Sequence, residues 1–223
     1  PLKEYEYGLM IRGISNLFYS PSITKEDEIK TQMYKDQSMR AEGKVKAANI
    51  EDYLASLGIL ITVHVDNLSQ VSRISQLTQK TNQFNLTTKR YSESEINDFI
   101  LSDDKIVLSI EIDDKYGSSG LTGLAILCKK LSKIDTLLLS CRVLGRNIEY
   151  KLMEIIVNIA NKQNIKLINS DYIKTQKNQQ VKDFYSQCGF HVIAESSNTT
   201  RYRLEAIDYK KKEIEYIRIK NGI

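Results

Sequence analysis

The chain has 223 residues, 41% hydrophobic and 27% charged, which is enough for one large domain or for one domain with an extension. Its net charge of +4 suits a phosphorylated or acidic partner but is too small to predict nucleic-acid binding. Two histidines exclude a histidine-rich metal centre, and no apolar run approaches the roughly 20 residues that span a bilayer. We therefore expect no metal in this chain, no nucleic acid and no membrane.

The cysteines favour a reducing compartment. Cys128, Cys141 and Cys188 show neither a close pairing nor the spacing of metal ligands, and we find no signal peptide. These features predict a cytoplasmic protein. The sequence starts at Pro1 without an initiator methionine, which is consistent with a fragment of a longer protein.

Helices are expected over residues 1–57. Apolar residues recur at helical spacing over 7–18, and a second, polar helix starts at Thr24 and runs toward Lys46. A short helix over 50–57 ends at Gly58, a residue type that commonly follows the last helical turn. We interpret this part as a helical extension that precedes a separate domain.

A domain with a mixed pattern is predicted over 58–206. Helices are expected over 70–82 and 92–100, after Gly145, and over 179–188. Strands are expected over 59–65, over 106–112 with one face buried, and over 121–128, 137–139, 166–170, 190–194 and 201–204. Residues 113–120 read as a turn, and residues 207–223 are expected to form a C-terminal tail.

The junction between the strand at 137–139 and the next helix predicts an anion site. Free N–H groups at a helix start attract anions, and two arginines add paired donors. The pattern resembles the Q/R-x-x-G-x-G/A loop of the GNAT superfamily, which binds the pyrophosphate of coenzyme A. Asn147 replaces the last small residue, which leaves room for a single phosphopantetheine phosphate. The predicted cofactor-binding residues here are Arg142, Val143, Leu144, Gly145, Arg146 and Asn147.

A second segment resembles the same superfamily. Asn178 precedes a helix that ends in Tyr-Ser-Gln-Cys-Gly-Phe, as in the GNAT segment where an asparagine meets the pantetheine arm. In that superfamily a tyrosine often protonates the leaving thiolate, so Tyr185 is the candidate general acid; the alternative is a core tyrosine. The resemblance implies an α/β (α+β) fold with a mixed, mostly antiparallel sheet flanked by helices.

The polar stretch QLTQKTNQFNLTTKRY, residues 76–91, carries many neutral donors beside a basic pair. Such groups suit a polyhydroxylated, phosphorylated small molecule. The alternative is a loop held by its own Asx and Ser/Thr turns. The predicted substrate-binding residues are Asn82, Gln83, Asn85, Thr87, Thr88 and Arg90.

This stretch, together with LLLSCRVLGR, closely resembles the C-terminal half of FkbH-like proteins, which start glyceryl-carrier-protein synthesis in polyketide pathways. The resemblance implies transfer of a glyceryl unit, derived from 1,3-bisphosphoglycerate, to the thiol of an acyl carrier protein. The family's phosphatase half, with its Asp-x-Asp motif and magnesium, is not evident here, so residues 1–57 would link to a phosphatase domain supplied in cis or in trans.

Cys141 is the candidate thiol for a glyceryl thioester. Its place at a strand end, near a helix start and between arginines, favours the thiolate; the alternative is a small buried hydrophobe. Two other functions stay open. One is an acetyl-coenzyme-A-dependent N-acyltransferase acting on an amine or amino sugar, which would not need Cys141. The other is a non-catalytic module that only docks a carrier protein.

Overall fold

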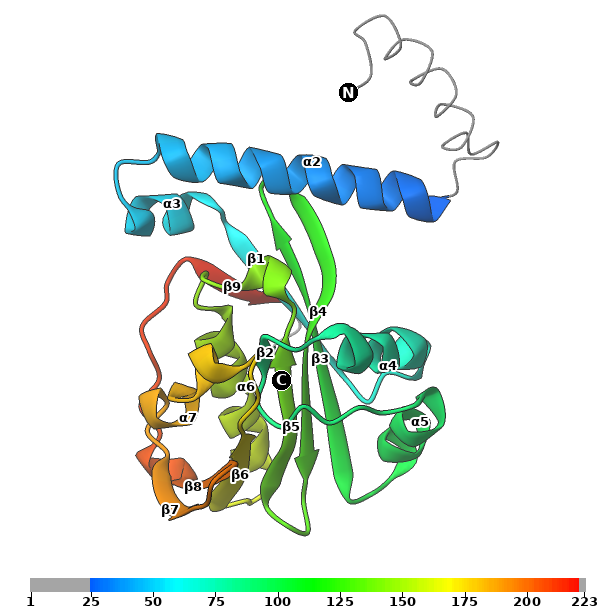
Figure 1. Cartoon of the computed structure of the whole chain (residues 1–223), viewed down its shortest axis with the longest axis vertical. Coiled ribbons are helices and arrows are strands. Elements are labelled where there is room, and N and C mark those ends of the chain that lie inside the picture. The colour runs from blue at the N-terminus through cyan, green and yellow to red at the C-terminus, as the bar shows by residue number, and fades with distance from the viewer. Residues whose placement is uncertain (1–24, 221–223) are drawn as a thin grey trace, which may run out of the picture.

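The computed structural model describes residues 25–220, so the predicted helix over 7–18 and the predicted start at Thr24 lie outside the described residues. The polar helix expected up to Lys46 is present as α2, Lys25–Lys46, which crosses one end of the sheet (Figure 1). The short helix that follows is α3, Ile50–Ser56, capped by Asn49. Gly58 then takes a positive φ of 61°, which turns the chain into the first strand.

One sheet organises the domain, and its strands lie in the order β7-β8-β6-β5-β4-β3-β1-β9. Two neighbouring pairs, β5 with β6 and β1 with β9, are parallel, and the other pairs described are antiparallel. The predicted mixed, mostly antiparallel architecture is therefore confirmed. The bounds are β1 Ile59–Val65, β3 Lys105–Asp114, β4 Gly117–Cys128, β5 Lys133–Leu139, β6 Leu167–Ile173, β7 His191–Glu195, β8 Thr199–Glu205 and β9 Ile217–Lys220.

Helices cover both faces of the sheet (Figure 1). The 3-10 turn η1, Leu68–Gln70, leads into α4, Val71–Lys80, and α4 packs beside α5, Glu93–Leu101, on one face. On the other face α6, Ile148–Lys162, fills the larger core. Along β4, Leu124 and Ile126 pack under α4 and α5, whereas Ala125 and Leu127 join the α6 core, as a period of two requires.

The prediction that the strand at 106–112 buries only one face is wrong. Residues Ile106 to Ile110 of β3 are all buried, because helices lie on both sides of this part of the sheet. The turn expected over 113–120 is also shorter, since β3 continues to Asp114 and β4 already begins at Gly117.

Segment 84–86 bridges two strands that diverge. Strands β5 and β6 pair only at Lys133–Asn169 and Ile134–Ser170, so they separate toward their carboxyl ends. The two-residue strand β2, Phe84–Asn85, pairs with the end of β5. Leu86 donates its N–H to Leu137 O (3.1 Å), and its carbonyl accepts the N–H of Ile173 on β6 (2.8 Å). A stretch predicted to be loop therefore fills the opening between the strands with backbone.

Two further expectations need correction. The helix expected over 179–188 is broken into a 3-10 turn η3, Gln179–Val181, and one turn of α-helix, α7, Phe184–Gln187. The segment expected as a C-terminal tail begins with the 3-10 turn η4, Ala206–Asp208, and supplies β9, which pairs in parallel with β1. Ile214 and Ile217 are buried, and hydrophobic burial therefore holds this segment against the domain.

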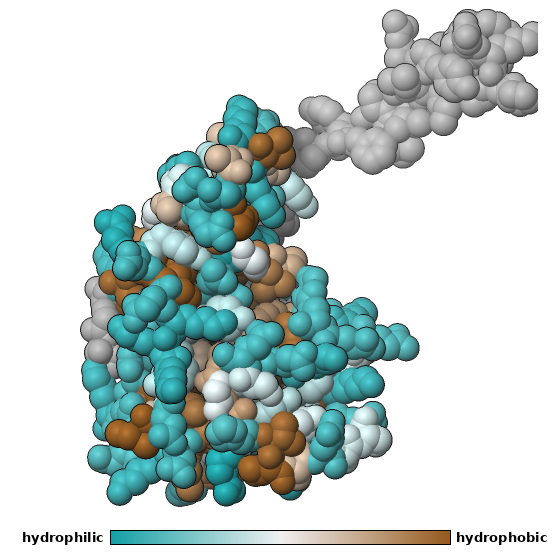
Figure 2. Space-filling view, turned by 90° about the vertical axis from the view of Figure 1, so that its left-hand side faces the viewer, coloured by the Kyte–Doolittle hydropathy of each residue, from teal (hydrophilic) through white to brown (hydrophobic). Residues whose placement is uncertain are grey.

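Hydrophilic side chains cover most of the face shown in Figure 2, and the hydrophobic patches on it are separate. Over residues 25–220, no helix combines the length and apolar character needed to cross a membrane.

Candidate functional site

Cys141 lies where β5 ends, in the 3-10 turn η2, Cys141–Val143, and its side chain is exposed. It borders a cavity of about 470 Å³ between this turn and the end of α4. We call this space the basic cavity. Its lining residues are Arg73, Gln76, Leu77, Lys80, Thr81, Asn82, Gln83, Ser140, Cys141 and Arg142.

Three cations line this cavity together with the thiol. Arg73 and Lys80 come from α4, Arg142 follows Cys141, and the described residues that line the cavity include no carboxylate. The pKa of the Arg142 guanidinium is lowered, first by burial and then by repulsion from Arg73, while the nearby Cys141 sulfur opposes the shift. Such a cluster attracts anions, phosphates above all, because guanidinium groups donate paired hydrogen bonds to them.

The sequence prediction missed Arg73 and Lys80. A signal was available, because Arg73, Gln76 and Lys80 are spaced three and then four residues apart and so share one face of a helix. That face looks toward Cys141 only because α4 packs on the sheet beside the end of β5.

Arg142 stands between two cavities. Its Nε donates to Ser140 Oγ (3.3 Å), and its Nη1 approaches Met33 Sδ of α2 at 3.5 Å. Besides the basic cavity it borders a second cavity of about 260 Å³ between α2 and β4, where Arg40 and Tyr34 are among its neighbours. Of the two arginines predicted to bind phosphate, Arg142 is therefore the one with access to an open space.

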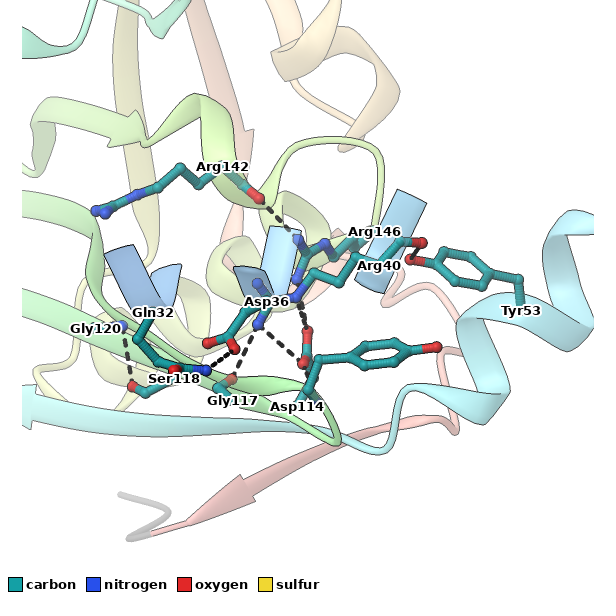
Figure 3. Close-up of polar contacts among 11 residues, drawn as sticks. Gln32, Asp36, Arg40, Tyr53, Asp114, Gly117, Ser118, Gly120, Arg142 and Arg146 are labelled. Atoms are coloured by element: carbon teal, nitrogen blue, oxygen red, sulfur yellow. Dashed lines mark hydrogen bonds and ion pairs between the residues drawn. The ribbon is translucent and has the colours of Figure 1, made fainter. Parts of the chain in front are cut away.

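Arg146 turns the other way, into the protein. It is 6% exposed, its Nη1 pairs with Asp114 Oδ2 at 3.0 Å, and its Nη2 donates to the carbonyl of Arg142 at 2.8 Å. Figure 3 shows its guanidinium between Asp114 and the Arg142 backbone. Its donors serve the protein's own structure, so the predicted role in phosphate binding needs correction.

The other residues of this loop are also largely occupied by the fold. Val143 is buried, and the N–H groups of Val143 and Leu144 donate to Ser140 O and Cys141 O. Asn147 adopts a positive φ of 63° at the start of α6, and its amide donates to Tyr216 Oη at 2.7 Å. Gly145 is exposed with a φ of 75° and has open space beside it.

A third cavity, of about 430 Å³, adjoins the first turn of α6 and includes Gly145, Glu149, Tyr150 and Phe184 in its lining. Burial raises the pKa of the Glu149 carboxyl, opposed by its own backbone N–H and then by Lys212. Its Oε2 is buried and has no hydrogen-bond partner within the described residues. The described lining includes this carboxyl and no cation, so this cavity offers a pyrophosphate less than the basic cavity does.

Asn178, predicted to meet a pantetheine arm, is fully buried. Its Nδ2 donates to the carbonyls of Asn85 and Ile173 (2.9 Å each), and its Oδ1 accepts the N–H of Thr175 (2.8 Å). These bonds tie segment 84–86 to β6. The side chain holds the fold together and has no free group for a ligand, so that predicted role also needs correction.

Tyr185, predicted as a general acid, is likewise fully buried. Its ring packs against Phe184, Phe190 and Tyr202, and its hydroxyl has no hydrogen-bond partner in the described part of the chain. Burial raises its pKa strongly, and the nearby Ser170 hydroxyl offsets only part of that effect. The core alternative fits this geometry, because none of the cavities described above reaches the hydroxyl.

The Tyr185→Phe protein is therefore expected to retain any transferase activity and to be as stable as the wild type or more stable. Removal of an unpartnered buried hydroxyl relieves a desolvation cost of about 1–3 kcal/mol. Urea denaturation and steady-state rates check both parts. A loss of activity beyond about tenfold in a folded protein, which corresponds to 1.36 kcal/mol, would restore the general-acid hypothesis.

The predicted substrate-binding stretch divides into two parts. Asn82 and Gln83 line the basic cavity, and Gln83 also borders the third cavity. Arg90 caps the end of α4 by donating to the carbonyls of Thr78 and Thr81 and to Asn82 Oδ1.

The other three residues of that stretch hold the loop together. Asn85 donates to Thr81 O (3.2 Å) and accepts the N–H of Thr88 (2.8 Å), and Thr87 donates to Asp135 O (3.2 Å). The alternative of a self-capping loop fits Asn85, whose bonds stay within the stretch, whereas Thr87 is held by the distant Asp135. Asn82 and Gln83 are the two predicted residues that line the basic cavity.

No family model and no curated protein matches this sequence. The fold, however, is shared with solved N-acetyltransferases. The ribosomal-protein-S18-alanine N-acetyltransferase from Escherichia coli superposes with a TM-score of 0.51 at 10% identity, covering 66% of this chain and 94% of that one.

Two more structures agree. The PaiA N-acetyltransferase from Thermoplasma acidophilum, solved in complex with coenzyme A, has a TM-score of 0.50 at 14% identity and covers 64% of this chain and 98% of that one. The spermidine/spermine N-acetyltransferase SpeG from Vibrio cholerae has a TM-score of 0.50 at 15% identity, with coverages of 67% and 95%. At such identities the likeness shows the fold alone: the chain has the GNAT fold.

Proposed function

We propose that this chain is an acyltransferase in which Cys141 receives a short acyl group from a phosphorylated donor and passes it to the thiol of an acyl carrier protein. The observation that carries the proposal is an exposed thiol in a cavity lined by three cations, Arg73, Lys80 and Arg142. The GNAT fold is consistent with acyl transfer, and an exposed thiol beside cations supports a route through an acyl thioester.

The reaction balances without a metal or a redox step. The Cys141 thiolate attacks the carbonyl carbon of an acyl phosphate, the bond from that carbon to the phosphate oxygen breaks, and phosphate leaves with the electron pair. The carrier-protein thiolate then attacks the resulting thioester, and Cys141 leaves as the thiolate. Arg142, Arg73 and Lys80 would hold the donor's phosphate and offset the charge that develops on it.

For the acyl group we propose glyceryl, donated by 1,3-bisphosphoglycerate, in polyketide or related biosynthesis. This choice rests on the resemblance of residues 76–91 to FkbH-like proteins. In the cavity, Asn82 and Gln83 place side-chain amides beside the cations, and each retains hydrogen-bonding capacity beyond its bond to Arg90 or Gln180. Removal of the second phosphate would fall to a phosphatase domain, in cis or in trans, that holds magnesium.

Intact-protein mass spectrometry after incubation with 1,3-bisphosphoglycerate tests the proposal. The wild type is expected to gain one phosphoglyceryl group that hydroxylamine removes, as a thioester requires. The Cys141→Ala protein is expected to gain none, and Cys188→Ala, which changes a buried thiol, should behave as the wild type. An adduct that persists in Cys141→Ala, or its absence from the wild type, overturns the proposal.

A second candidate is an N-acyltransferase that uses acetyl-coenzyme A, which is what the names of the solved structures with this fold favour. The cavity beside Gly145 counts against it, because its described lining offers a pyrophosphate no cation. Calorimetric titration with acetyl-coenzyme A separates the two. Micromolar binding, with acetylation of an amine by the Cys141→Ala protein, would establish the second candidate. Carrier loading that survives in Cys141→Ala without such binding would indicate a docking module.

A further inference from the structure

A buried carboxylate, Asp114, joins two arginines that come from distant parts of the chain. Arg40 of α2 pairs with it in a fork, Nε to Oδ2 at 2.8 Å and Nη2 to Oδ1 at 3.0 Å, and Arg146 pairs with Oδ2 at 3.0 Å. The three side chains are 0–8% exposed. Figure 3 shows the fork between α2 and the end of the β3–β4 hairpin.

From this carboxylate a chain of contacts reaches the backbone beside the thiol. Arg146 also donates from Nη2 to the carbonyl of Arg142 at 2.8 Å, and Arg142 directly follows Cys141. Figure 3 shows the Arg142 side chain leaving this contact in the opposite direction. This bond fixes the backbone of Arg142, which is the point from which its side chain extends.

Helix α2 is itself anchored at the same place. Tyr53 donates its hydroxyl to the carbonyl of Arg40 at 3.0 Å, and Arg40 donates to the carbonyl of Gly117 at 3.0 Å. Met33, two turns before Arg40, contacts the Arg142 guanidinium directly. Helix α2 is therefore linked to Arg142 in two ways: Met33 contacts the Arg142 guanidinium, and Arg40 is connected through Asp114 and Arg146 to the Arg142 carbonyl.

We propose that Arg40 is a positioning residue for the acyl-transfer site. It acts through Asp114 and Arg146 on the position of Arg142. The position of Arg142 in turn sets the positive charge that an anion meets at Cys141. The inference takes from the proposed function only that Cys141 is the reacting group. It makes α2 part of the transferase unit, although α2 precedes the domain predicted from the sequence.

The two-point contact between Arg40 and Asp114 predicts that lysine cannot replace Arg40. Lysine keeps the charge of Arg40 but presents a single ammonium, which cannot reproduce a planar, two-point contact with Asp114. Both Arg40→Lys and Arg40→Met should therefore loosen the positions of Arg146 and Arg142. If only the net charge of Arg40 mattered, Arg40→Lys would behave as the wild type.

Charge-selective alkylation of Cys141 measures this effect. Iodoacetate is an anion and iodoacetamide is neutral, so the ratio of their rates reports the local positive charge, while thiol exposure and reactivity cancel. Peptide mapping assigns the label to Cys141, and Arg142→Met gives the ratio expected without that guanidinium. The Arg40→Lys and Arg40→Met ratios should fall about three- to tenfold toward that value.

Lys133→Met is the matched control, because it breaks another partly buried ion pair, Lys133 with Asp171 at 2.6 Å, outside the basic cavity. Its ratio should equal that of the wild type. A wild-type ratio in folded Arg40→Lys protein overturns the proposal, and the lysine variant decides the matter if Arg40→Met does not fold. No acyl donor is used, so this outcome is independent of whether a glyceryl adduct forms.

Discussion

Replacement of Asp114 with alanine is expected to lower the free energy of unfolding by about 3–5 kcal/mol, because breaking a buried ion pair leaves its partner uncompensated. Here two guanidinium groups, those of Arg40 and Arg146, would lose their common carboxylate while they are 5% and 8% exposed. Urea denaturation followed by circular dichroism measures the change.

The matched control is Asp183→Ala, since Asp183 pairs with Lys182 at 3.9 Å and both side chains are more than half exposed. Such a surface pair contributes about 0–1 kcal/mol, so this variant should be close to the wild type. If Asp114→Ala lost no more than the control, the buried cluster would not stabilise the attachment of α2.

The double variant Arg73→Met, Lys80→Met is expected to weaken binding of the phosphorylated donor by at least about 100-fold, because two charge-assisted hydrogen bonds of about 1.5–3 kcal/mol each are lost. The two side chains lie on the exposed face of α4, so the fold should tolerate their loss. The measurement is the rate of adduct formation on Cys141 as a function of 1,3-bisphosphoglycerate concentration.

Net charge alone could weaken an anionic donor, so the control removes two charges elsewhere. Lys44→Met, Lys46→Met changes exposed residues in the last turn of α2 that do not line the basic cavity. A donor affinity reduced equally in both double variants would mean that the effect is long-range and that Arg73 and Lys80 do not bind the donor. High salt should reduce such a long-range effect.

Several local features could be predicted from neighbouring residues. At the start of α5, Ser92 and Glu95 form a capping box, in which each side chain accepts the backbone N–H of the other residue three positions away. The polar helix α2, the short helix before Gly58 and the strands of a mixed sheet also follow the predicted order. Their signals, capping and periodicity, are contained in a single segment and need no distant partner.

The roles of the two arginines before α6 could not be predicted in this way. Arg142 and Arg146 are four residues apart and chemically identical, and the sequence indicates only that both could bind an anion. Asp114, 32 positions from Arg146, turns one of them inward, and Arg40 completes the same cluster from 74 positions away. In a similar way, the side-chain amide of Asn178 is committed to the backbone carbonyl of Asn85, 93 positions away.

The sequence by itself determined most of the helices and strands, because propensity and periodicity act over a few residues. Its resemblance to the GNAT superfamily indicated the type of sheet, and it left open whether Cys141 is buried or exposed. Only the tertiary structure decided that segment 84–86 fills the opening between β5 and β6 and that Arg73 and Lys80 join Arg142 around Cys141. The reason is that a buried polar group is satisfied by whichever partner the packing brings near it, whatever their separation along the chain.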